Sequence, residues 1–152
     1  MDSIRISSIS KDNNENFYIG TRSDHGIIVL SEKGIKVDQY FPLLPDPVSG
    51  KIPRTIVGEI AVDKSDRLWI PLYNVGLSTF SLVDKKFELH TPDPNNKNSL
   101  SDAQIETIMI DNSGAIWLGA ARSLMNHDSE KKKFSLISNS QKADIKSSYD
   151  EK

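Results

Sequence analysis

The sequence predicts an all-β fold, and three observations support this prediction. An isoleucine, an aspartate three residues later and an apolar–aromatic–apolar triplet five residues further on recur three times, around Asp12, Asp63 and Asp111. The stretches between turn residues are short and either apolar or β-branched, which is typical of strands. No window of the chain has the period of a long amphipathic helix.

The spacing of the repeat predicts the architecture. The three aspartates lie 51 and 48 residues apart, close to the roughly 40 to 50 residues of one four-stranded propeller blade. We therefore expect a partial β-propeller of about three four-stranded antiparallel blades. The residues that define the repeat are Asp12, Tyr18, Asp63, Trp69, Asp111, Gly114 and Trp117.

The strands of the second and third units follow from turn residues such as Lys64-Ser65-Asp66 and Asn74-Val75-Gly76. Short runs with no helical crossover between them indicate an antiparallel meander. The expected strands are 59–63, 67–72, 77–82 and 86–90 in the second unit, and 107–110, 115–119, 124–127 and 133–137 in the third. As domains, we expect blade 1 with a long connecting loop at 1–56, blade 2 at 57–104, blade 3 at 105–138 and a polar, disordered tail at 139–152.

The aromatic strand indicates how the blades pack. Leu68-Trp69-Ile70 is apolar on both faces of the strand, so both faces must be covered. Neighbouring blades provide that cover, and a large ring supplies roughly 150 to 250 Å² of buried surface. We expect the repeat aspartates to accept backbone N–H bonds at hairpin turns rather than to act as catalytic carboxylates, and Gly114 to take a positive φ.

Three positions depart from the repeat. Pro71 stands where the other units have Gly20 and Gly119, so we expect the strand to end early or to bulge there. Glu15 and Asp66 occupy the position of Gly114. If their turns also need positive φ, each costs on the order of 1 kcal/mol.

Composition excludes several classes of function. The net charge is −2 and the chain has no cysteine, so we expect no nucleic-acid partner, no disulfide and no thiolate chemistry. His25, His90 and His127 lack the spacing of a zinc site. We expect no metal, no cofactor and no catalytic residue, because nucleotide-binding and nucleophile-elbow motifs are also missing. No apolar run is long enough to span a bilayer, and we expect no membrane contact by this segment.

Function is expected in the loops. In a meander, the turns between the second and third strands lie on the same side as the connections between blades, and variable loops on a repetitive scaffold usually carry specificity. Planar donors and an aromatic face on these turns can hold a sugar or a carboxylate. The candidate ligand-binding residues are Arg22, His25, Tyr73, Asn74 and Arg122.

A family resemblance rests on two segments. Asp111-Asn112-Ser113-Gly114-Ala115-Ile116-Trp117-Leu118-Gly119 follows the loop Asn98-Ser99-Leu100-Ser101-Asp102, and Tyr18-Ile19-Gly20-Thr21 repeats the ending. These segments resemble the two-component regulator propeller repeat, which builds the periplasmic sensor region of hybrid two-component systems in Bacteroidetes. The resemblance implies a periplasmic or extracellular location, a parent histidine kinase and phosphorelay, and a ligand such as an oligosaccharide or another small polar molecule. Residues 1–15 lack the apolar core of a secretory signal, so we expect the export signal to lie outside this sequence.

Three functional readings remain open. The first is a ligand-sensing segment that signals through domains absent from this chain. The second is a fragment of a carbohydrate-active propeller enzyme, which would need a carboxyl group with a raised pKa. The third is a protein-interaction propeller, slightly favoured by Phe41, Leu43 and Leu44. Since propellers use roughly four to eight blades, we expect remaining blades or a homo-oligomer to complete the ring.

Overall fold

The computed structural model describes residues 4–22, 25–40 and 57–137, and these residues form three four-stranded antiparallel sheets with no helix among them. Blade 1 holds β1 (Ile6–Lys11), β2 (Phe17–Thr21), β3 (Ile27–Leu30) and β4 (Lys36–Tyr40). Blade 2 holds β5 (Ala61–Val62), β6 (Arg67–Leu72), β7 (Gly76–Ser81) and β8 (Phe87–His90). Blade 3 holds β9 (Ile105–Ile110), β10 (Ile116–Ala120), β11 (Leu124–Asp128) and β12 (Lys133–Leu136).

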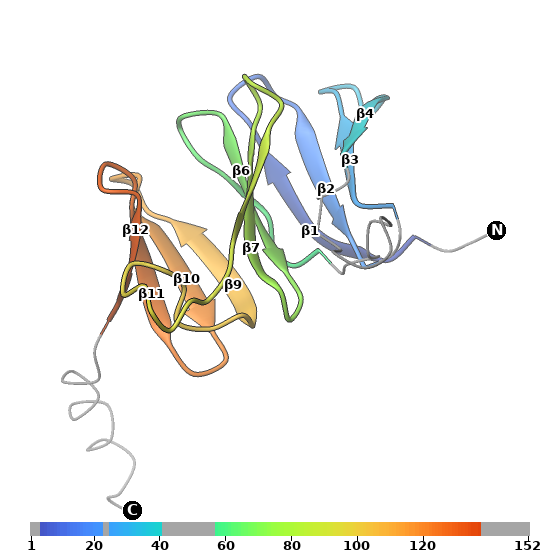
Figure 1. Cartoon of the computed structure of the whole chain (residues 1–152). Helices are drawn as coiled ribbons and strands as arrows, with labels where there is room; N and C mark the ends of the chain where they lie inside the picture. Colours follow the sequence, from blue (N-terminus) through green and yellow to red (C-terminus); the bar gives the residue numbers. More distant parts are fainter. Residues whose placement is uncertain (1–3, 23–24, 41–56, 138–152) are drawn as a thin grey trace, which may run out of the picture.

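The sheets stack in chain order. Each sheet is an up-and-down meander in which neighbours in the sequence are neighbours in the sheet, and blade 2 lies between blades 1 and 3 (Figure 1). The first strands meet, because β5 contacts β1 on one side and β9 on the other. First strands gathered together and last strands outermost are the arrangement of propeller blades around an axis. The prediction of a partial β-propeller of three four-stranded antiparallel blades is confirmed.

A local hydrogen-bonded latch closes the first hairpin of each blade. In blade 2, Asp63 Oδ1 accepts the backbone N–H groups of Ser65 (2.8 Å) and Arg67 (3.0 Å). Its Oδ2 accepts the indole N–H of Trp69 at 2.8 Å. One carboxylate therefore fixes both the turn and the ring of the following strand.

The same latch recurs in the other two blades. Asp111 Oδ2 accepts the Trp117 indole N–H at 3.0 Å, and Asp12 Oδ2 accepts the Tyr18 hydroxyl at 3.0 Å. Tyrosine can replace tryptophan in blade 1 because its O–H also reaches the carboxylate. A positive φ is present at Gly114 (89°), as expected, and also at Glu15 (63°) and Asp66 (55°), the two positions for which its cost was considered.

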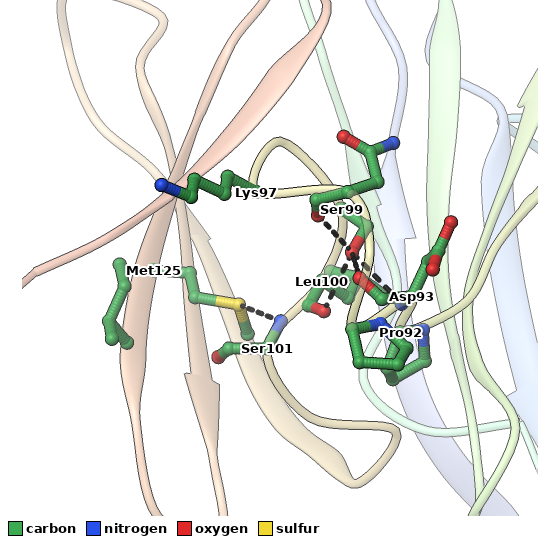
Figure 2. Close-up of a pocket in the computed structure, with 10 residues that line it drawn as sticks. Pro92, Asp93, Lys97, Ser99, Leu100, Ser101 and Met125 are labelled. Carbon is green, nitrogen blue, oxygen red and sulfur yellow. Dashed lines mark hydrogen bonds between the residues drawn. The ribbon is translucent and has the colours of Figure 1, made fainter.

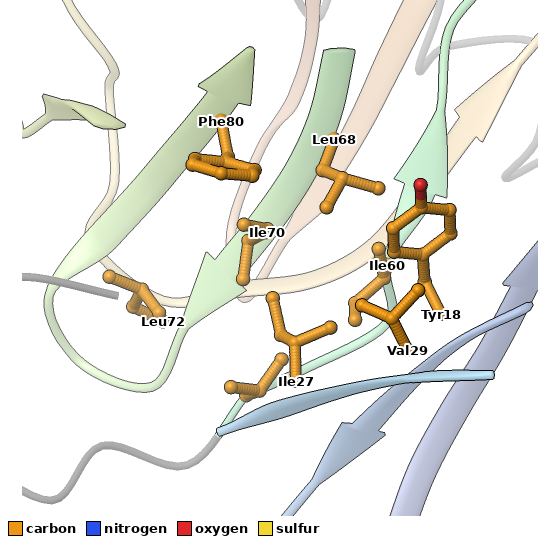
Figure 3. Packing of buried hydrophobic residues seen from close by; sticks show 9 residues of the cluster. Tyr18, Ile27, Val29, Ile60, Leu68, Ile70, Leu72 and Phe80 are labelled. Atoms are coloured by element: carbon orange, nitrogen blue, oxygen red, sulfur yellow. The ribbon is translucent and has the colours of Figure 1, made fainter. Parts of the chain in front are cut away.

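Two apolar seams join the blades. The seam between blades 1 and 2 packs side chains of β2 and β3 against side chains of β5, β6 and β7 (Figure 3). Its members are Tyr18, Ile27, Val29, Val57, Ile60, Leu68, Ile70, Leu72 and Phe80. The seam between blades 2 and 3 contains Trp69, Leu77, Leu100, Ile105, Ile108, Ile116, Leu118, Met125 and Phe134.

β6 contributes to both seams, as its sequence predicts. Leu68 and Ile70 face blade 1, whereas Trp69 between them faces blade 3, and all three side chains are fully buried. Alternation along the strand places successive side chains on opposite faces. A strand that is apolar on both faces is thus covered by a neighbour on each side.

Pro71 does not end its strand, and that expectation is wrong. β6 runs through Pro71 to Leu72 and pairs with Gly76 and Leu77 of β7 without a register shift. The irregularity lies instead on the β5 side, where regular pairing stops at Trp69 and a bridge between Val57 and Leu72 resumes it with a shift of one residue. Proline lacks an N–H but keeps its carbonyl, which accepts the Gly58 N–H at 2.8 Å.

No helix in the described ranges is long and apolar enough to cross a membrane. The expected tail at 139–152 and the loop that contains Phe41, Leu43 and Leu44 lie outside the described residues.

Candidate functional site

The turns that carry the candidate binding residues lie at one end of the blades, which we call the loop face. It comprises Arg22 and residues 25–26 of the first turn, the turns 73–75 and 121–123, and the described parts of the connections between blades, 57–60 and 91–104. Hydrogen bonds tie turns to connections there. The Ala121 N–H donates to the Gln104 carbonyl (3.1 Å), and the Val57 N–H donates to the Thr21 carbonyl (3.3 Å). The loop face thus has backbone hydrogen bonds between a blade and the connection beside it.

The five candidate residues occupy equivalent turns of the three blades. Arg22, Tyr73, Asn74 and Arg122 are exposed, and His25 is half-buried. Tyr73 has 56% of its surface exposed, so its ring is available for stacking. The structure places all five on the loop face, although none of them lines the pocket described next. Their role in ligand binding stays a prediction.

A pocket of about 390 Å³ lies between the loop that joins blades 2 and 3 and the outer strands of blade 3 (Figure 2). Apolar side chains from both parts line it, and polar side chains of the loop surround them. The lining residues are Pro92, Asp93, Pro94, Asn96, Lys97, Ser99, Leu100, Ser101, Met125 and Leu136. Sequence reasoning missed this pocket, although Asn98–Ser101 was part of the motif that carried the family resemblance.

The pocket wall is held by a dense set of hydrogen bonds. Ser99 Oγ donates within the loop, with distances of 3.0 Å to the Asp93 carbonyl and 2.8 Å to the Asn96 carbonyl, and it accepts the Asp93 N–H at 2.9 Å. The Asn98 carbonyl accepts the Phe134 N–H at 2.9 Å. Leu100 is 2% exposed and anchors the loop in the seam between blades 2 and 3. The Asn-Ser-Leu-Ser sequence therefore shapes a rigid loop.

An aromatic cluster lies in the seam between blades 2 and 3. The His127 ring contacts Trp69 (4.8 Å between centroids) and Phe134 (4.7 Å), and His90 lies 5.3 Å from Phe134. Burial and the nearby His90 lower the pKa of His127 to about 4, and burial also lowers the pKa of His90. Among the described residues, no group of three or more His, Asp or Glu side chains could hold a metal ion.

Two repeat aspartates, Asp12 and Asp111, have lowered pKa values. Hydrogen bonds from Ser113 and Trp117 lower the pKa of Asp111 to about 2. Burial raises the pKa of Asp12, but hydrogen bonds from Asn16, Tyr18 and Asn14 outweigh this effect and lower it overall. A general acid at neutral pH needs a raised pKa. These carboxylates are held ionised by the turns that they close.

Solved structures with a similar fold include extracellular domains of two-component systems. The extracellular domain of the hybrid two-component system BT3049 from B. thetaiotaomicron superposes with a TM-score of 0.73 at 16% identity, over 92% of this chain and 19% of that chain. The extracellular domain of BT4673 from the same organism gives a TM-score of 0.67 at 17% identity, over 88% of this chain and 18% of that one. The fold is a partial β-propeller. The likeness to these domains supports, at the level of fold, the resemblance to two-component regulator propeller repeats.

The same fold also occurs in enzymes. Virginiamycin B lyase from Staphylococcus aureus gives a TM-score of 0.61 at 12% identity, over 87% of this chain and 40% of that chain. No protein-family model and no curated protein sequence matched the chain. This chain spans about a fifth of the length of the two extracellular domains. The fold is therefore shared by domains of two-component systems and by a lyase.

Proposed function

We propose that this chain is a ligand-sensing segment of an extracellular or periplasmic two-component sensor, and that its loop face binds an oligosaccharide or another small polar ligand. The observation that carries the proposal is the likeness, over 92% of this chain, to the extracellular domain of a hybrid two-component system. Signalling through a histidine kinase and phosphorelay takes place in domains outside these 152 residues. A ligand shifts such a receptor only through different affinities for its two arrangements.

The chemistry of the loop face supports a polar, preferably anionic, sugar. The guanidinium groups of Arg22 and Arg122 are exposed and can each bind a carboxylate through two parallel hydrogen bonds. The exposed ring of Tyr73 offers an apolar face on which a sugar ring can stack, while the Asn74 amide can donate and accept. A sugar with a carboxylate would use both kinds of group.

The shifted pKa values of carboxyl groups support binding rather than hydrolysis. Among the described residues, the carboxyl groups with a shifted pKa all have a value below the ordinary one; they are Asp12, Asp38, Asp111 and Asp128. Glycoside hydrolysis needs a protonated carboxyl group as its general acid. None of these four carboxyl groups meets that requirement.

Titration calorimetry against matched neutral and acidic oligosaccharides tests the proposal. We expect binding of an acidic oligosaccharide that weakens at least tenfold in Arg22→Ala, Arg122→Ala and Tyr73→Ala. The control is Lys33→Ala, which removes an exposed cation at the opposite end of blade 1. Absence of heat and of thermal shift across the panel, or shortened sugars after incubation, would contradict a sensing role.

A further inference from the structure

The two outer faces of the three-blade stack contain the same repeat positions that form the two internal seams. Each blade is a sheet with two faces. We call the face that carries the repeat aromatic residue the forward face; in blades 1 and 2 it packs on the following blade. We call the opposite face, which carries the isoleucine three residues before the repeat aspartate, the rear face; in blades 2 and 3 it packs on the preceding blade. Among the described residues, neither the forward face of blade 3 nor the rear face of blade 1 packs against another blade.

Burial differs sharply between internal and terminal forward faces. Ile27 of blade 1 and Leu77 of blade 2 are each 0% exposed, whereas Leu124 at the same repeat position of blade 3 is 45% exposed. Trp117 is only half-buried, although Tyr18 and Trp69 at the corresponding positions are 4% and 0% exposed. Cross-strand pairing places Met109, 57% exposed, directly beside Trp117. Blade 3 thus presents an apolar strip of Met109, Trp117 and Leu124.

The rear face shows the same contrast. Ile60 of blade 2 and Ile108 of blade 3 are 4% and 6% exposed, while Ile9 at the equivalent position of blade 1 is 65% exposed. Ile9 pairs across the sheet with Ile19, and the half-buried Phe17 lies on the same face. The isoleucine at this repeat position is thus buried in blades 2 and 3, where an internal seam covers it, and exposed to solvent in blade 1.

A polar contact also recurs at the internal seams. Ser8 Oγ of blade 1 accepts the backbone N–H of Ile60 at 3.1 Å. One blade on, Glu59 Oε2 accepts the backbone N–H of Ile108 at 3.3 Å. Thr107 occupies the corresponding position of blade 3, where its hydroxyl donates to Glu59 Oε2 of blade 2 at 2.5 Å.

We propose that two copies of this chain associate head to tail, with the forward face of blade 3 in each copy packing on the rear face of blade 1 in the other. Both halves of the seam are present on one chain, so a second copy supplies the partner that each face requires. Two copies contribute six blades, within the roughly four to eight that close a propeller. A head-to-tail contact forms a closed ring when its rotation closes, here after two copies. The resulting dimer contains two new seams built like the internal ones.

Light scattering coupled to size exclusion tests the proposal on the whole chain. We expect a mass of twice the 17.0 kDa of the monomer. Ile9→Lys and Met109→Glu should each give a monomer, because each places a charge in both seams of the dimer. The matched control is Val83→Glu, which adds a charge at an apolar residue that is 73% exposed in a turn outside both faces. This variant should remain a dimer.

An equimolar mixture of the two disrupting variants provides a second readout. It leaves one seam unaltered and sets lysine against glutamate in the other, so we expect the dimer mass to return. Circular dichroism spectra matching wild type exclude misfolding as the cause of dissociation. A wild-type chain that stays monomeric at all concentrations would overturn the proposal. A monomer is the result expected if other blades, rather than a second copy, cover these faces. Dimers insensitive to both substitutions, or a series of ever larger oligomers, would overturn it as well.

Discussion

The latch between Asp63 and Trp69 makes a quantitative prediction about stability. The substitution Asp63→Ala removes the acceptor of three hydrogen bonds, from the backbone of Ser65 and Arg67 and from the indole of Trp69. Water can replace the carboxylate at the first two donors, because Ser65 is exposed and Arg67 is half-buried. Water does not reach the Trp69 side chain, which is 0% exposed.

Two losses determine how far Asp63→Ala lowers the free energy of unfolding: the two turn hydrogen bonds, and the partner of the buried indole N–H. A buried donor without a partner costs about 1 to 3 kcal/mol, and each solvated turn bond contributes about 0.5 to 1 kcal/mol. Asp63→Ala should therefore lower the free energy of unfolding by about 2 to 5 kcal/mol. In a Trp69→Phe background the donor is already gone, so the same change should cost only about 1 to 2 kcal/mol.

Urea unfolding followed by far-ultraviolet circular dichroism measures all four members of this double-mutant cycle. We expect a coupling free energy of about 1 to 3 kcal/mol between the two sites. Asp84→Ala is the control, since Asp84 is an exposed hairpin aspartate whose side chain accepts a bond from Ser81 Oγ at 3.3 Å. Its effect should stay within about 0.5 kcal/mol. If Asp63→Ala matched this control, or if the two effects simply added, the latch would not stabilise the blade as argued.

Three further predictions concern other features of the blades. Because burial and the charge of His90 lower the pKa of His127 from 6.5 to about 4, the folded state binds fewer protons than the unfolded state in that window. The free energy of unfolding should then fall as the pH drops from 6.5 to 4. Urea titrations should show a smaller fall in His127→Phe. If the free energy of unfolding of this variant depended on pH as in the wild type, His127 would not be the group responsible. Asp66→Gly should raise stability by about 1 kcal/mol in the same assay, since Asp66 has a φ of 55° and a buried Oδ1 without a hydrogen-bond partner. Gly76→Ala should lower the melting temperature more than Gly114→Ala, because a Cβ at Gly76 would collide with the His90 carbonyl oxygen whereas Gly114 has nothing within 4 Å; equal losses would contradict this steric argument.

The sequence was sufficient to predict the fold because the repeat marks a local structure. The aspartate at the bend and the ring six residues later are both readable as letters, and the hairpin turn needs only neighbouring residues. Alignment with Gly114 also identified Glu15 and Asp66 as the residues that would bear a positive φ if their turns needed one, and both have it. Local chemistry and repetition were enough for these features.

The contacts between blades were beyond sequence reasoning. Nothing in the order of residues showed that Glu59 would accept a bond from Ile108, 49 residues away. Pro71 was misread because its effect depends on which side of β6 needs an N–H. The pocket beside Leu100 was missed for a similar reason, since it is formed by a loop folding back on strands that follow it. The five candidate binding residues could be placed on one face from the meander, but their contacts with a ligand could not be derived.

The Asp–ring latch also bears on how such a chain can change during evolution. The bonded atoms belong to residues only six positions apart, so each blade carries its own means of closure. A gene duplication that copies about fifty residues would copy a finished hairpin along with them. Later substitutions in the connecting loops leave that hairpin intact. New recognition surfaces can therefore evolve in the loops without renewed selection for the hairpin itself.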